Sequence, residues 1–171
     1  MRDATYWIER LHLAPHPEGG FYVETYRSPV TLPTEVLPAD FVAPRSAATA
    51  IYFLLAGDDF SAFHRLRSDE VWHHYAGSPL TIHRIEPDGT LTQDRLGGDI
   101  DSGGFPQTTI PAGCWFAATV DDPASYALVG CTMAPGFSPA DLELAGREAL
   151  LRAFPRHRAL IERLTRPERG D

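Results

Sequence analysis

Two side chains six residues apart, His64 and Glu70, are the best candidates for proton transfer in this sequence. An imidazole titrates near neutral pH, so a buried histidine held by a carboxylate can remove or supply a proton at cellular pH. A tyrosine can act as the opposing acid or orient a substrate hydroxyl, and strand parity favours Tyr22 and Tyr52. We therefore expect His64, Glu70 and Tyr52 to be catalytic.

Several aromatic and polar side chains are candidates for binding a ligand near this pair. An aromatic face beside hydroxyl and charged groups suits sugars and nucleobases. The residues expected to contact the ligand are Tyr22, Glu24, Trp72, His74 and Phe116. The segment Pro17-Glu18-Gly19-Gly20 is interpreted as structural, because proline fixes φ and glycine permits positive φ in a tight turn.

Short strands are the elements that must position these residues. Apolar stretches alternate with turn residues throughout residues 48–133, and Pro87-Asp88-Gly89 is a strong hairpin signal. Strands at spacings of about ten residues favour a sandwich or barrel over alternating strands and helices. The expected strands cover residues 21–26, 50–55, 70–75, 80–85, 90–96, 107–110, 114–120 and 126–133.

Helices are expected on both sides of this core. Residues 5–13 have the spacing of a short amphipathic helix capped by Asp3, and Ser138 followed by Pro139 is a good helix start. Two helices are expected at residues 146–154 and 155–164. Residues 28–44, with four prolines, are expected to form a long loop that acts as a lid or an interface arm.

The sequence thus predicts one all-β domain over residues 1–171. Its parts are an N-terminal helix within residues 1–13, a core of residues 48–133, and C-terminal helices within residues 138–166.

The amino-acid composition indicates which kinds of partner and which cellular compartment to expect. A formal charge of −8 and the lack of a basic stripe argue against nucleic acid, and no apolar run approaches the roughly 20 residues of a membrane span. The two cysteines, Cys114 and Cys131, form no CxxC pair, which favours a reducing compartment. We expect a soluble cytoplasmic protein that binds a small molecule.

The middle of the chain resembles the cupin superfamily in its two motifs. The first cupin motif runs through a glycine, His-x-His, a glutamate and a second glycine, and the second runs through a glycine, Pro-x-Gly and a histidine. The counterparts in this sequence are, in order, Gly57, His64-Arg65-Leu66, Glu70 and Gly77, then Gly104, Pro111-Ala112-Gly113 and Phe116. The resemblance implies a cupin-type double-stranded β jelly roll.

A closer resemblance covers nearly the whole chain. The segments that carry it are Pro15 to Tyr22, Glu24 to Arg27, His64-Arg65, Ser68 to His73 and Pro135-Gly136-Phe137. They are similar to a small uncharacterised cupin branch, domain of unknown function 985. This resemblance implies a homodimer but little about chemistry, because a fold does not determine a function.

The departures from the cupin motifs bear on metal binding. Metal-binding cupins supply two histidines and a glutamate from the first motif and a histidine from the second, and Leu66 and Phe116 replace two of these ligands here. Two protein ligands rarely hold a divalent metal. We therefore expect no cofactor. If a divalent metal is bound, strand alternation offers His74, and the ligands are His64, Glu70 and His74.

Three functions stay open at this point. The first is a metal-independent isomerase or epimerase acting on a polar, sugar-like metabolite with His64 as base. Its residue inventory is similar to that of cupin-fold epimerases of nucleotide-linked sugars, which pair a histidine base with a tyrosine acid. The second is a non-catalytic module that binds or senses a metabolite. The third is a metal-dependent oxygenase or hydrolase that uses His64, Glu70 and His74.

Overall fold

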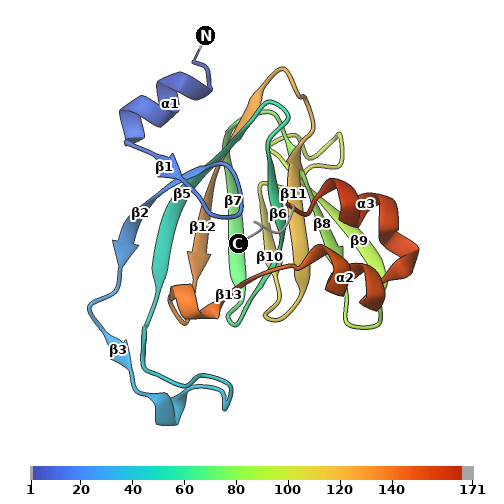
Figure 1. Ribbon diagram of the computed structural model, residues 1–171. Helices are drawn as coiled ribbons and strands as arrows, with labels where there is room; N and C mark the ends of the chain where they lie inside the picture. The colour runs from blue at the N-terminus through green and yellow to red at the C-terminus, as the bar shows by residue number, and fades with distance from the viewer. Residues whose placement is uncertain (1, 167–171) are drawn as a thin grey trace, which may run out of the picture.

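Two antiparallel sheets packed face to face form the centre of the computed structural model, which describes residues 2–166 (Figure 1). The first sheet contains, in spatial order, β1 (Ala14–Pro15), β2 (Phe21–Arg27), β5 (Thr49–Ala56), β12 (Tyr126–Met133), β7 (Glu70–Gly77) and β10 (Gln107–Ile110). The second contains β13 (Leu142–Leu144), β6 (Phe60–Leu66), β11 (Trp115–Val120), β8 (Leu80–Ile85) and β9 (Leu91–Leu96). The expected all-β sandwich is confirmed.

Each expected strand is present, with ends within two residues of those expected. Three strands of the two sheets were not expected: β1, β6 and β13. Strands β6 and β13 pair with each other at one edge of the second sheet. In β6 the sequence Phe-Ser-Ala-Phe-His-Arg-Leu mixes apolar and polar residues on both faces, so its alternation is weak. The strand that carries His64 was thus the least visible in the sequence.

The outer faces of the two sheets are covered by helices (Figure 1). Helix α1 (Ala4–Leu11) packs on the first sheet around Leu54 and Leu128, and Asp3 caps it by accepting a 2.8 Å hydrogen bond from the backbone N–H of Tyr6. Helices α2 (Arg147–Ala153) and α3 (Arg158–Arg163), joined by the turn η3 (Pro155–His157), pack on the second sheet. The expected helices are confirmed, although α3 has six residues where ten were expected. The helix start expected at Ser138 is corrected, because Pro139 opens only the single 3-10 turn η2 (Pro139–Asp141) and strand β13 follows it.

Residues 28–48 extend from the sandwich as an arm (Figure 1). The arm was expected to be a loop and instead contains two short paired strands, β3 (Thr31–Leu32) and β4 (Arg45–Ser46), and the turn η1 (Thr34–Val36). A buried ion pair at 2.6 Å joins Arg45 to Asp141 in the turn η2 (Pro139–Asp141), so the returning strand is anchored to the sandwich.

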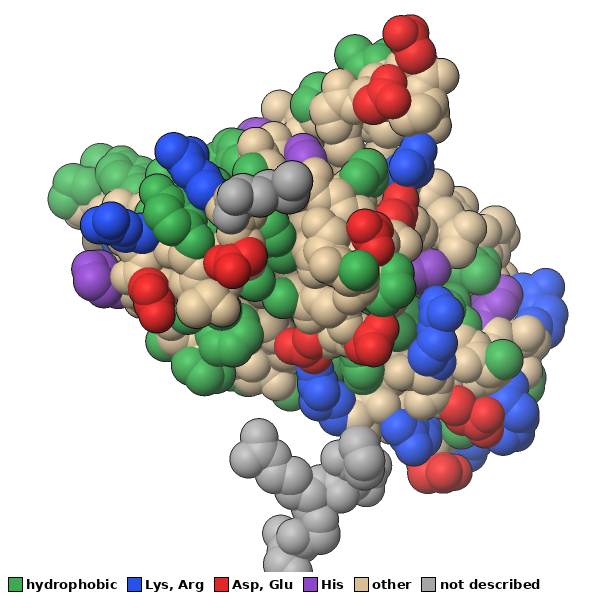
Figure 2. Space-filling view, turned by 90° about the horizontal axis from the view of Figure 1, so that it is seen from above, with side chains coloured by type: hydrophobic (Ala, Val, Ile, Leu, Met, Phe, Trp, Pro, Cys, Tyr) green, Lys and Arg blue, Asp and Glu red, His purple; other side chains and the backbone are tan. Residues whose placement is uncertain are grey.

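The described surface carries charges of both signs. Acidic and basic side chains are interspersed on the face shown in Figure 2. Within residues 2–166, no helix is long and apolar enough to cross a membrane. Residues 1 and 167–171 of the expected domain lie outside the described part of the chain.

Candidate functional site

A cavity of about 340 Å³ lies between the sheets at one end of the sandwich. Its walls come from the first halves of β5 and β7, the last half of β12, strand β2, and the segment that follows β12. A cavity of this size accommodates a small metabolite. The lining residues are His16, Glu18, Tyr22, Glu24, Arg27, Thr49, Ile51, Phe53, Leu66, Glu70, Trp72, Cys131, Met133, Phe137, Pro139 and Leu142.

A buried polar contact at this cavity joins Glu18 to His64. Nε2 of His64 lies 3.1 Å from Oε2 of Glu18, and the two residues are 1% and 6% exposed. Glu18 lines the cavity, whereas His64 lies behind it and is not among the lining residues. Any molecule in the cavity therefore meets the carboxyl group of Glu18 first.

The hydrogen bonds of His64 fix where its proton lies. Nδ1 is 2.7 Å from the carbonyl oxygen of Ala62, which can only accept, so Nδ1 carries a proton. The contact between Nε2 and Glu18 then needs one further proton, held either by the carboxyl group or by the imidazole. Burial raises the pKa of Glu18 and lowers the pKa of His64, so both shifts favour the neutral forms. At 3.1 Å, Nε2 of His64 and the carboxyl group of Glu18 are close enough to exchange a proton.

A tight turn between β1 and β2 delivers Glu18 to this position. Gly19 and Gly20 have φ values of +116° and +71°, and the backbone carbonyl of Glu18 accepts a 2.8 Å hydrogen bond from the N–H of Ala62 in β6. A Cβ atom at Gly19 would lie 2.1 Å from the carbonyl oxygen of Phe60. Glycine is therefore required for the turn to approach β6, and this approach brings Glu18 to His64.

Glu70 is the second buried carboxyl group of the cavity. Its Oε2 accepts a 2.6 Å hydrogen bond from the indole N–H of Trp72, and the residue is 7% exposed. Burial, reinforced by the nearby charge of Glu18, raises the pKa of Glu70 to about 7. Its protonation state is thus balanced near neutral pH.

Most of the residues expected at the ligand site are brought to one cavity. Glu70, Tyr22, Glu24 and Trp72 line it. Phe116 is not a lining residue, and its ring packs on the imidazole of His64 at 4.1 Å between ring centroids. The polar contacts of Glu18, which sequence reasoning assigned to a structural turn, place a further residue at the site.

Tyr52 and His74 are not brought to the cavity. Tyr52 lies on the outer face of the first sheet, where it belongs to the cluster beneath α1 and contacts Tyr75. The expected placement of Tyr52 beside His64 is therefore corrected. Nε2 of His74 lies 3.1 Å from the carbonyl oxygen of Ser78 instead. Four residues along a strand span about 13 Å, so His74 is far from Glu70.

This geometry does not fit a metal ion. Both nitrogens of His64 already have partners, and Leu66 and Phe116 occupy the positions of two further ligands in the resemblance to metal-binding cupins. Among residues 2–166, no three His, Cys, Asp or Glu side chains are arranged to hold a metal. The set His64, Glu70 and His74 does not assemble, because His74 is too far along β7.

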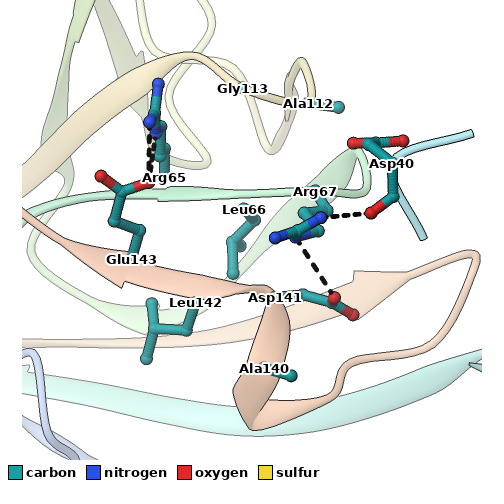
Figure 3. Close-up of a pocket in the computed structure, with 10 residues that line it drawn as sticks. All are labelled: Asp40, Arg65, Leu66, Arg67, Ala112, Gly113, Ala140, Asp141, Leu142 and Glu143. Atoms are coloured by element: carbon teal, nitrogen blue, oxygen red, sulfur yellow. Dashed lines mark hydrogen bonds and ion pairs between the residues drawn. The ribbon is translucent and has the colours of Figure 1, made fainter. Parts of the chain in front are cut away.

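A second hollow, of about 330 Å³, lies on the outside of the sandwich near β13 and β6 (Figure 3). Its charged side chains are paired: Arg65 lies 2.7 Å from Glu143, and Arg67 contacts Asp141 and the backbone carbonyl of Asp40. Leu66 lines both this hollow and the inner cavity. The paired charges leave the inner cavity as the better candidate site.

Comparison with known proteins assigns the chain to a family. A model of the cupin superfamily, domain of unknown function 985, matches residues 5–145. The chain belongs to this cupin family. It is similar to protein SO0799 from Shewanella oneidensis, with 41% identity, a TM-score of 0.87, and coverage of 98% of this chain and 100% of that one. A hypothetical protein from Leishmania major is similar at 35% identity and a TM-score of 0.87, over 96% and 99% of the two chains.

More distant relatives support the fold of this cupin. The uncharacterized yeast protein YML079W from Saccharomyces cerevisiae is 27% identical over 78% of this chain and 71% of its own length. Oxalate decarboxylase from Bacillus subtilis has a TM-score of 0.53 at 13% identity, over 92% of this chain and 40% of that one. That last likeness concerns the fold alone, and it supports the expected jelly roll.

Proposed function

We propose that this cupin is a metal-independent isomerase or epimerase that moves a proton on a small polar metabolite bound in the inner cavity. The single observation that carries the proposal is the buried contact of 3.1 Å between Oε2 of Glu18 and Nε2 of His64 at the cavity wall. A pair that holds one proton can accept a second or give up the first. His64 was expected to be the base. In this proposal Glu18 is the base that contacts the substrate, and His64 positions Glu18.

The proposed step uses groups that the cavity presents. Glu18, in the ionised form paired with a protonated His64, removes a proton from a carbon next to a carbonyl group, and the electron pair of that C–H bond moves onto the carbonyl oxygen. Tyr22 lines the cavity, and its hydroxyl group has no hydrogen-bond partner within residues 2–166, so it is free to donate to this oxygen. For an isomerase, Glu18 returns the proton to the adjacent, former carbonyl carbon, while a hydroxyl group on the first carbon gives its proton back to Tyr22 and becomes the new carbonyl. For an epimerase, the enolate turns over in the cavity before Glu18 returns the proton, so that the opposite face of the same carbon is protonated. No redox partner is needed in either case.

Deuterium exchange tests this proposal without knowledge of the substrate. The protein is incubated in D₂O with a deproteinised extract of bacterial metabolites, and labelled compounds are detected by mass spectrometry. We expect the wild type to add deuterium to at least one metabolite, and Glu18→Gln to lose this activity by about 100-fold or more. Glu143→Gln, which neutralises a carboxylate in the outer hollow, should retain it.

Three outcomes of this experiment would overturn the proposal. Labelling that persists in Glu18→Gln would remove the proposed base. A metabolite that is retained by the protein but recovered unlabelled would favour the non-catalytic binding module instead. Absence of both labelling and retention would reject both functions.

We also propose that the protein is a homodimer, as its family resemblance implies. Support comes from strand β2, which pairs on its outer side only with the two residues of β1, and from exposed Tyr26 and Val30 at its end and beyond. An unpaired strand edge with exposed apolar residues is suited to contact a second copy. Light scattering should give twice the chain mass of 18.9 kDa, and a value equal to that mass would refute the dimer.

A further inference from the structure

The inner cavity has an excess of acid over base. Among the described residues, its ionisable lining consists of three glutamates, one arginine, one histidine, one tyrosine and one cysteine. Glu18 is compensated by His64, and Glu24 by Arg27 at 2.6 Å. Glu70 is the third glutamate. Within the described residues it has no ion-pair partner, and its only hydrogen-bond donor is the indole of Trp72.

The groups that face Glu70 do not supply a cation. Glu18 approaches from the turn before β2, with His16 at 3.6 Å from it, while His64 approaches from β6 and Cys131 from β12. Burial lowers the pKa of His16, which favours its neutral form near pH 7. When His64 is protonated, its charge is matched by that of the ionised Glu18, so within residues 2–166 no surplus cation faces the carboxyl group of Glu70.

The one arginine of the lining is already engaged. Nε and Nη2 of Arg27 bind the carboxylate of Glu24 at 2.9 and 2.6 Å, and Nη1 donates to the carbonyl oxygen of Phe137 at 3.1 Å. Arg27 is also largely exposed, at the mouth of the cavity. Among the described residues, the cavity thus holds an uncompensated acid and no free cation, which makes the entry of an anionic ligand electrostatically unfavourable.

From this charge distribution we propose that the ligand carries a basic nitrogen, and that this nitrogen binds Oε1 of Glu70 inside the cavity. Oε1 has no hydrogen-bond partner among residues 2–166, while Oε2 is fixed by Trp72. The cationic group would also contact aromatic side chains of the lining, Tyr22, Phe53 and Trp72, whose ring faces attract cations. The pairing would compensate the last buried acid of the cavity.

This inference rests on the proposed function for its purpose, since Glu70 then anchors the substrate while Glu18 moves the proton. It makes a separate claim about substrate class, namely a small amine that also carries the reacting carbonyl group. A neutral sugar would fill the cavity but leave the carboxyl group of Glu70 without a cation.

Three probes of the same shape and different charge test the inference by calorimetry slightly above neutral pH: benzylamine, benzyl alcohol and benzoate. We expect benzylamine to bind at least about tenfold more tightly than benzyl alcohol, and benzoate to bind most weakly. Glu70→Gln should bind benzylamine and benzyl alcohol equally, because the amide keeps the shape but not the charge. Glu143→Gln should behave as the wild type does.

The comparison of the three probes in the wild type needs no variant, so it decides the matter even if Glu70→Gln does not fold. Equal binding of benzylamine and benzyl alcohol, tighter binding of benzoate, or no binding of benzylamine at millimolar concentrations would overturn the inference. A charge preference that persists in Glu70→Gln would also overturn it. Deuterium labelling that depends on Glu18 would survive any of these results, so failure here is distinct from failure of the proposed function.

Discussion

Replacement of Glu70 by glutamine should stabilise the protein, by an amount that depends on pH. The carboxyl group is buried without an ion-pair partner among residues 2–166, and its pKa rises from an ordinary value of 4.5 to about 7 in the folded protein. The folded state therefore binds this proton more tightly than the unfolded state does. The resulting stability is fully present below pH 4.5 and is lost as the pH rises through about 7.

The size of the effect follows from the two pKa values. At about 1.4 kcal/mol per pKa unit, the wild type loses about 3 kcal/mol between pH 4.5 and a pH above 7 through this one group. Glutamine cannot ionise, and its amide oxygen can still accept the hydrogen bond from Trp72. The free energy of unfolding of Glu70→Gln, relative to the wild type, should thus rise by about 3 kcal/mol over this range.

Urea unfolding of both proteins, at a series of pH values from 4 to 8, measures this difference. A change of about 3 kcal/mol corresponds to roughly 6–12 °C in the melting temperature of a chain of this size. Glu143→Gln is the matched control, because Glu143 is exposed and paired with Arg65, and its difference from the wild type should vary little with pH. A difference between Glu70→Gln and the wild type that stays flat with pH would refute the claim that Glu70 is buried without compensation.

Three further perturbations follow from the structure. Gly19→Ala should lower the free energy of unfolding by at least about 3 kcal/mol, since the added Cβ would meet the carbonyl oxygen of Phe60. Gly113→Ala, at φ +76° and with open space around it, should lower the free energy of unfolding by about 1 kcal/mol. Equal melting temperatures of the two variants would contradict this. Asp141→Asn should destabilise the protein by about 3–5 kcal/mol in urea unfolding, because it leaves Arg45 buried without its partner, and a loss below about 1 kcal/mol would contradict it. Elemental analysis of untagged protein should show far less than one metal per chain, and a full equivalent would contradict the assignment of a metal-independent site.

The sequence predicted the positions of the strands better than it predicted which side chains of each strand point into the sandwich. In β5 the residues on both faces are apolar or aromatic, because the inner face packs in the sandwich and the outer face packs under α1. Alternation identifies the buried face of a strand only when the other face is polar. The wrong face was therefore assigned to Tyr52, whereas the inward position of Tyr22 in the edge strand β2 was correct.

Two site residues could not be placed by local pattern at all. Glu18 lies in a segment whose proline and glycines predict a turn, and only the long-range contact of that turn with Ala62 brings its carboxyl group to His64. For His74, strand alternation predicts the face of the sheet but not the position along the strand axis. Its imidazole contacts the carbonyl oxygen of Ser78, farther along the sandwich. The sequence holds no local signal for Glu18, because the burial of its carboxyl group is visible only in the structure.

The replacement of two ligand positions by Leu66 and Phe116 explains why the remaining polar groups are arranged as they are. Without an ion to bind, Nε2 of His64 is free to pair with an acid, and the turn before β2 supplies Glu18 for this purpose. That pairing compensates one buried carboxyl group and leaves Glu70 without a cation. Because an uncompensated buried acid costs stability, its presence in the cavity wall is best explained by a ligand that completes the charge balance. The loss of the metal positions and the proposed preference for a cationic ligand therefore have the same physical origin.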